Sequence, residues 1–159
     1  MNNTQSDPIA ILMNEHKAVK ERFGALLSAE GNQRAAILAE IKEMLAVHNA
    51  TEENVIYPAV HSLADRPMHA RTLYHEQDDA EVALWDLASL KPDDSEFVRK
   101  ATELRDALLA HVKREEESEF KHLREDLSPE ETRKMTAEFV AFRETLTHQK
   151  SNGSALTRR

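Results

Sequence analysis

The stretch His111-Val-Lys-Arg-Glu115 places a His and a Glu four residues apart, and His48-Asn-Ala-Thr-Glu52 repeats the spacing. On a helix, residues four apart point the same way from successive turns. A lone His precedes each pair on a helical pattern: His16 lies 32 residues before His48, and His75 lies 36 before His111. The pattern indicates two copies of one helix-turn-helix unit, which together offer four His and two Glu to the middle of a bundle.

The composition favours a single all-α domain. The 159 residues suffice for one core, and only three of them are Gly, which argues against a sheet rich in tight turns. The net charge of -8 argues against binding to nucleic acid or anionic lipid, and no apolar run is long enough to span a bilayer. With no Cys and a polar N-terminus that does not resemble a signal peptide, a cytoplasmic location is expected.

Apolar residues at helical spacing predict five helices, with a helical bundle over residues 1–149 and a disordered tail over 150–159. The fifth helix is amphipathic and is expected to pack on the outside of the bundle. The expected helix starts are, in order, Ser6-Asp7-Pro8, Asn32, Asp65-Arg66-Pro67, Asp93 and Ser128-Pro129. Pro58 lies inside the second pattern and predicts a bend or break near Tyr57.

The predicted turns place the six His and Glu side chains at similar heights. At a rise of about 1.5 Å per residue, the mismatches between antiparallel neighbours amount to roughly 3 to 5 Å. All six therefore fit one layer of an up-down-up-down bundle. Imidazole and carboxylate ligands suit a pair of iron or manganese ions, and acid should release them because bound histidines must be neutral. The alternative is a cluster of His–Glu hydrogen bonds in the core.

At these residues the sequence resembles the hemerythrin family, specifically the bacterial hemerythrin-like proteins called HHE cation-binding domains. The resemblance covers roughly Ile9 to Leu123. The matching pieces are Glu15-His16, His48-x3-Glu52-Glu53 with Tyr57-Pro58, Tyr74-His75-Glu76, and His111-x3-Glu115-Glu116 with Phe120. The resemblance implies two iron ions with an oxo, hydroxo or water bridge. His16 and His48 would bind one iron, His75 and His111 the other, and Glu52 and Glu115 would bridge them.

Two departures bear on the expected activity. Oxygen-carrying hemerythrins have a His where this chain has Asp79, and their fourth helix uses His-x4-Asp in place of His-x3-Glu. The resemblance thus favours chemistry with oxygen, peroxide or nitric oxide, such as catalase-like peroxide removal, over reversible oxygen carriage. The alternative is a non-enzymatic module that senses redox state or handles iron, with a protein partner that the sequence does not identify.

Several other residues are expected to have ordinary roles. Tyr57 and Trp85 are predicted to be packing residues, with a hydrogen bond from Tyr57 to the site as the less favoured alternative. Asp79 is about equally favoured as a ligand and as a solvated residue. The single Glu-x-x-His motif, Glu119-x-x-His122, argues against a ferritin-like site, which needs two on separate helices.

Overall fold

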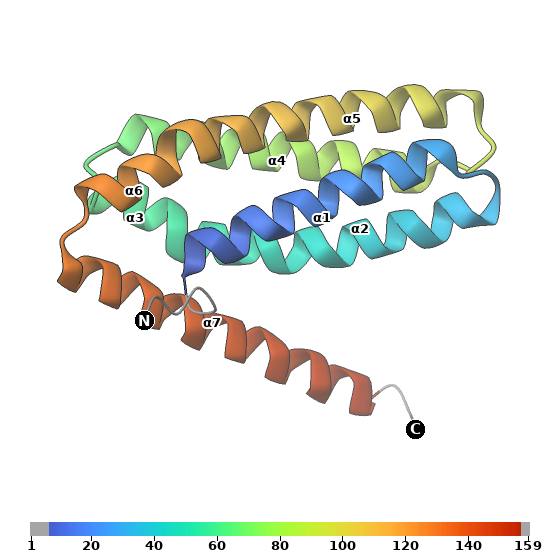
Figure 1. Cartoon of the computed structure of the whole chain (residues 1–159). Coiled ribbons are helices and arrows are strands. Elements are labelled where there is room, and N and C mark those ends of the chain that lie inside the picture. Colours follow the sequence, from blue (N-terminus) through green and yellow to red (C-terminus); the bar gives the residue numbers. More distant parts are fainter. Residues whose placement is uncertain (1–6, 157–159) are drawn as a thin grey trace.

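The computed structural model describes the backbone of residues 7–156 and the side chains of residues 7–149, and no strand occurs within them. Four helical rods form an up-down-up-down bundle (Figure 1). The rods are α1 (Pro8–Ser28); α2 (Asn32–Thr51) with the π-helical η1 (Glu52–Ile56) and α3 (Tyr57–Ser62); α4 (Pro67–Ser89); and α5 (Ser95–Arg114) with the π-helical η2 (Glu115–Glu119) and α6 (Phe120–Asp126). A further helix, α7 (Pro129–Leu156), follows. The predicted all-α bundle with an additional C-terminal helix is confirmed.

The helix ends follow from local side-chain chemistry. The Asp7 carboxylate accepts a hydrogen bond from the Ile9 backbone N–H at 3.0 Å, directly before Pro8 in the first turn of α1. Gly31 joins α1 to α2 with a φ of 52°, in the left-handed region that favours glycine. Ser128 and Glu131 form a reciprocal capping box at the start of α7.

The apolar core is divided into two clusters along the bundle. One cluster joins the start of α1 to α3, α6 and α7, and it comprises Ile9, Leu12, Val55, Ile56, Tyr57, Ala59, Val60, Ala70, Leu73, Phe120, Leu123, Leu127, Met135 and Phe139. The other fills the opposite end, and it comprises Val19, Phe23, Leu26, Leu38, Ile41, Leu45, Ala80, Leu84, Leu87, Phe97, Ala101 and Leu104. The buried His and Glu side chains come from helix positions between the two clusters.

The inner face of α4 differs from the predicted one. Its buried residues recur every three or four positions: Ala70, Leu73, Gln77, Ala80, Leu84 and Leu87. The apolar pattern of this segment predicts an inner stripe through Met68, His75 and Val82, with Trp85 beside it. Met68, Val82 and Trp85 are instead 63% to 73% exposed. The predicted stripe through His75 is therefore wrong, because the apolar residues that defined it lie on the outer face. Trp85 is correspondingly not a core residue.

The second and fourth rods each contain a π turn, which begins at the Glu of the His-x3-Glu pair. In η1 the Tyr57 N–H donates to the Glu52 carbonyl, and in η2 the Phe120 N–H donates to the Glu115 carbonyl, each bond spanning five residues. Pro58 sits in the first turn of α3, so the irregularity predicted near Tyr57 takes the form of a π turn. The η2 turn forms without a proline, which shows that the π turns do not depend on one.

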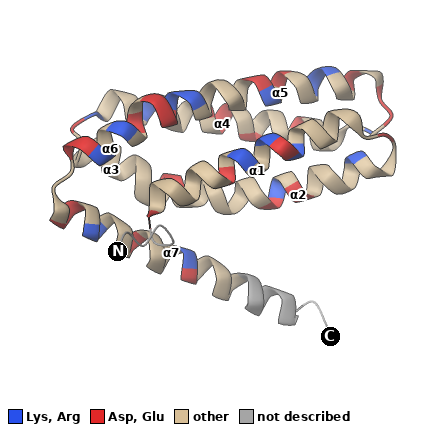
Figure 2. Cartoon of the chain, viewed as in Figure 1, with Lys and Arg blue, Asp and Glu red and all other residues tan. Residues whose placement is uncertain are grey.

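The fifth predicted helix, α7, packs on the bundle as expected. Met135 and Phe139 join the first apolar cluster, and Arg143 contacts α1 and α2. The helix continues to Leu156, so residues 150–156 of the predicted tail are helical, and residues 157–159 lie outside the described part. Figure 2 shows acidic positions interspersed with basic ones along α5 and α6. Among the described helices, none combines the length and apolarity needed to cross a membrane.

Candidate metal centre

Five of the six predicted site residues converge in the bundle: His16, His48, Glu52, His111 and Glu115. Each is at most 7% exposed, and both carboxylates are completely buried. They come from α1, the end of α2, the end of α5 and the first residues of the two π turns. The His-x3-Glu spacing places each Glu one turn after its His, as predicted.

One half of the centre contains two imidazoles. The Nε2 atoms of His16 and His48 lie 3.1 Å apart. Glu52 Oε1 lies 3.1 Å from His48 Nε2 and 3.8 Å from His16 Nε2. Glu115 Oε2 lies 3.3 Å from His16 Nε2. Two nitrogens and two carboxylate oxygens thus face a common point.

The other half contains one imidazole. Glu115 Oε1 lies 3.2 Å from His111 Nε2, so the Glu115 carboxylate spans both halves. The Tyr57 hydroxyl lies 2.9 Å from Glu115 Oε1, 3.2 Å from Glu52 Oε2 and 3.1 Å from His111 Nε2. Its single hydrogen can serve one of these acceptors at a time. Tyr57 therefore belongs to the centre, and the prediction that it only packs is wrong.

The residues present fit a pair of cations. Two sets of donor atoms lie within 4.8 Å of one another: His16, His48 and Glu52, and Glu52, His111 and Glu115. Glu52 Oε1 and Glu115 Oε2 are buried and accept no hydrogen bond from the described residues. A buried carboxylate oxygen without a donor is costly, and a cation would remove that cost. When both rings are neutral and carry their hydrogen on the Nδ1 atom that faces Glu116 or Glu15, the Nε2 atoms of His16 and His48 both direct lone pairs at the same point.

The other ring nitrogen of each histidine is held by a further carboxylate. Nδ1 of His48 lies 2.8 Å from Glu15, Nδ1 of His16 lies 2.9 Å from Glu116, and Nδ1 of His111 lies 2.9 Å from Glu76. Carboxylates in this position fix the ring orientation of metal-binding histidines and leave Nε2 for the metal. Each of them adjoins a predicted site residue in the sequence, which is the signal that could have identified them.

His75 does not join the centre. It is exposed on α4 and lines a surface groove with Tyr74 and Asp78. Gln77 points inward in its place, and its amide donates to Glu52 Oε2 at 3.2 Å. The prediction that His75 lies level with the other five side chains is therefore corrected, since its turn of α4 faces outward. Asp79 is also exposed and is not among the gathered donor groups.

The neighbouring carboxylates raise the pKa of each buried histidine of the centre. Burial alone would lower the pKa of His16, but the nearby negative carboxylates of Glu115 and Glu52 outweigh it and raise the pKa to about 10. For His48 and His111, burial is likewise outweighed by the neighbouring carboxylates, and both pKa values rise to about 9. Burial would raise the pKa of Glu52, yet His48 and His16 hold it well below its usual range.

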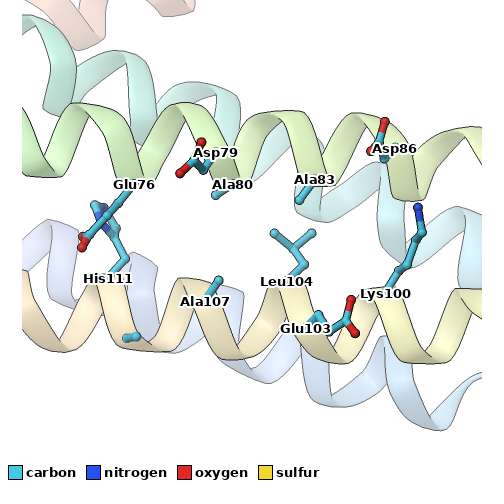
Figure 3. A pocket seen from close by; sticks show the side chains of 11 residues that line it. Glu76, Asp79, Ala80, Ala83, Asp86, Lys100, Glu103, Leu104, Ala107 and His111 are labelled. Carbon is cyan, nitrogen blue, oxygen red and sulfur yellow. The ribbon is translucent and has the colours of Figure 1, made fainter.

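Two spaces adjoin the centre. A small internal cavity of about 30 Å³ is bordered by His16, His48, Glu52, Gln77 and His111, with apolar walls that include Val19 and Leu45. A larger groove of about 540 Å³ runs between α4 and α5. Figure 3 shows Glu76 and His111 at one end of the groove and Asp86 and Lys100 at the other, with alanines and Leu104 between. His111 thus borders both spaces.

The comparisons with known proteins agree with this geometry. A DNA nickase from Nostoc sp. (strain PCC 7120 / SAG 25.82 / UTEX 2576) is 28% identical over 146 residues, which are 91% of this chain and 41% of the relative. The chain therefore spans less than half the length of that relative. Residues 7–123, which include all five gathered His and Glu residues, match the family described as the hemerythrin HHE cation-binding domain. Because the match covers most of the chain and the buried His and Glu donors, the chain belongs to the hemerythrin HHE cation-binding family.

Proposed function

We propose that this chain holds two iron ions in the buried layer and reacts there with oxygen, peroxide or nitric oxide. The observation that carries the proposal is the pair of buried carboxylates, Glu52 and Glu115, each belonging to a set of gathered donors and each with one oxygen that accepts no hydrogen bond. Two carboxylates with imidazoles on either side form a donor set suited to a pair of ions. The family match supports iron.

The ligands divide unequally between the two proposed ions. His16, His48 and one oxygen each of Glu52 and Glu115 would hold the first. His111 with the remaining carboxylate oxygens would hold the second. Since the second ion has a single imidazole, it would keep positions open for a small molecule, and bound iron would supply electron transfer there. The Tyr57 hydroxyl lies on this side of the centre and can donate a hydrogen bond to a molecule that replaces one of its present partners.

The size of the internal cavity supports a small substrate. A volume of about 30 Å³ exceeds the roughly 10–15 Å³ that one water requires, and it suits a molecule as small as oxygen or hydrogen peroxide. Its walls combine apolar side chains with the Gln77 amide, whose carbonyl oxygen accepts no hydrogen bond among the described residues. That oxygen is an acceptor available to a protonated guest such as hydrogen peroxide.

The most specific form of the proposal is peroxide disproportionation, in which two hydrogen peroxide molecules become two water molecules and one oxygen molecule. The decisive experiment combines metal analysis and a near-ultraviolet spectrum of protein from iron-replete cells with an oxygen-electrode assay for peroxide. Two irons per chain with charge-transfer absorption and oxygen release above that of free iron are expected. Clearly fewer than two metals per chain would refute the metal proposal, and a rate equal to that of free iron would refute peroxide removal alone.

The alternative function is a non-enzymatic redox or iron-handling module. The observation in its favour is that Arg143 of α7 donates to Glu15, which lies against His48. A change in the position of His48 could therefore alter the contact with this outer helix. Such a module would show different melting temperatures or oligomeric states in metal-free, ferrous and ferric forms. Identical behaviour in all three forms would refute it. DNA nicking is not proposed, because the match to the nickase covers 41% of that protein and this chain carries a net charge of -8.

A further inference from the structure

We infer that Arg143 of α7 is a positioning residue for His48, acting through Glu15. The inference rests on the proposed metal site in so far as His48 is a ligand. Arg143 lies outside residues 7–123, which match the family, so its role does not follow from membership of that family. It would make the additional helix part of the machinery that orients one ligand.

The contacts form a continuous chain from α7 to the imidazole. Arg143 Nη1 donates to Glu15 Oε1 at 2.7 Å, and Nη2 donates to Glu15 Oε2 at 2.9 Å. Glu15 Oε2 also lies 2.8 Å from His48 Nδ1. A two-point guanidinium–carboxylate contact fixes the plane of the carboxylate as well as its position. The plane of Glu15 in turn determines where the His48 ring finds its hydrogen-bond partner.

Arg143 is itself held in place. Its Nε donates at 2.6 Å to the hydroxyl of Thr51, a fully buried residue directly before Glu52. Its guanidinium also lies 5.0 Å from the centre of the Phe139 ring, on the same helix. The side chain is 22% exposed, so solvent competes less for these contacts than it does at an ordinary surface pair. Arg143 thus links α7, α1 and the end of α2.

The three histidines differ in how their outer carboxylates are secured. Glu76, beside His111, is contacted by Arg114, which is half-exposed and lies three residues after His111 on the same rod. Glu116, beside His16, has no Lys or Arg partner within the described side chains. Of these three outer carboxylates, only Glu15, beside His48, is contacted by a residue of α7. Loss of the α7 contact should therefore disturb His48 and leave His111 unchanged.

The test compares Arg143→Met, Arg143→Lys and the matched control Arg114→Met. Methionine keeps an unbranched apolar side chain near Phe139 and removes all donors, whereas lysine keeps the charge but loses the two-point contact. In metal-free protein, nitrogen NMR of the imidazoles should show the His48 signals moving in R143M, with a smaller movement in R143K and the His111 signals unmoved. R114M should give the reverse pattern.

A second measurement uses Co(II) alone, with a competing chelator. In R143M one of the two ions should bind more weakly, by up to the ~10- to 100-fold that losing the direct partner of a metal-bound histidine costs, because Glu15 is kept but is no longer held in its plane; R143K should be intermediate. R114M should retain the affinity of the ion held by His48. Circular dichroism shows whether the total helix content is kept in each variant.

The outcomes separate this inference from the proposed function. If His48 signals are unmoved in R143M, or if all three histidines move equally in both R143M and R143K, the inference is overturned. If R143M unfolds, R143K decides the question by the same criterion. If the unaltered protein binds no Co(II), the proposed metal site fails, while the NMR comparison still decides whether Arg143 positions His48.

Discussion

Replacing His111 with glutamine should remove a pH-dependent part of the stability of the metal-free protein. His111 is suited to this test because its ring contacts Glu76, Tyr57 and Glu115 and, within the described side chains, no other histidine. Burial would lower its pKa, yet Glu115 and the other carboxylates raise the pKa from 6.5 to about 9 in the folded chain. A raised pKa stabilises the folded state below the unfolded value of 6.5, and this stabilisation is lost as the pH rises through about 9.

The size of the effect follows from the same values. The difference between 6.5 and about 9, at ~1.4 kcal/mol per pH unit, corresponds to about 3 kcal/mol. Urea unfolding in the presence of a chelator, at pH values from 6 to 9.5, would give the free energy of unfolding for both proteins. The stability advantage of the unaltered protein over H111Q should shrink by about 3 kcal/mol across that range.

A control substitution of an exposed histidine, His75→Gln, corrects for the loss of a histidine as such. Between pH 6 and 9.5, the stability advantage of the unaltered protein over H111Q should shrink by most of ~3 kcal/mol more than its advantage over H75Q does. A difference between the unaltered protein and H111Q that stays constant within about 0.5 kcal/mol, the usual effect of a surface change, would refute the claim that carboxylates hold a proton on His111.

Glu52→Ala or Glu115→Ala should remove at least one of the two bound ions in metal analysis, because each carboxylate belongs to the gathered donor groups. Glu117→Ala, a change at an exposed residue, serves as the control. An unchanged number of ions per chain would count against carboxylates that bridge the two ions. Tyr57→Phe should destabilise the metal-free protein by about 1–3 kcal/mol in urea unfolding, since the buried carboxylate that accepts its one hydrogen loses a donor. No change would mean that the hydroxyl is dispensable. His75→Ala should leave metal content unaltered, because the side chain faces outward, and a lost ion would contradict the placement of α4. The iron-loaded protein should nick supercoiled plasmid no faster than the same concentration of free iron does. Faster nicking would contradict the prediction that the chain does not bind nucleic acid.

The sequence predicted the fold and most of the centre because the decisive residues continue the apolar stripes of their helices. His16, His48 and His111 share faces with Leu12, Ile41 and Leu104, so helical spacing alone directs them inward. The two His-x3-Glu pairs then add Glu52 and Glu115 one turn later. That a metal binds there remains a prediction.

The inner face of α4 could not be found in the same way. Its buried positions include Ala70, Gln77 and Ala80, which carry a weak hydrophobic signal, while Val82 and Trp85 lie on the exposed side. Leu73, Leu84 and Leu87 do mark the buried face, but Met68, Val82 and Trp85 compete with them on the other side of the helix. The predicted stripe followed the second set and so brought His75 inward. Packing against the neighbouring helices decides this rotation, and that information is not local to the sequence of α4.

The hydrogen bonds of Tyr57 to the centre were the less favoured alternative for a different reason. In an α-helix a residue five positions on points to another face, whereas an i→i+5 turn brings it back over the first residue. The η1 turn thereby sets the Tyr57 hydroxyl 3.2 Å from Glu52. In η2 the corresponding arrangement places the Phe120 ring stacked against His16, with ring centres 5.8 Å apart. Neither π turn has a marker in the sequence that distinguishes it from an ordinary helix.

The two π turns also affect how this chain is to be aligned with its relatives. A turn closed over five residues contains one residue more than the α-helical turn that it replaces. A related helix without that turn would match this chain only if a one-residue gap were opened between Glu52 and Tyr57, or between Glu115 and Phe120. Without the gap, every later position on the rod would be compared with a neighbour rotated by about 100°, so inward-facing residues would be scored against outward-facing ones.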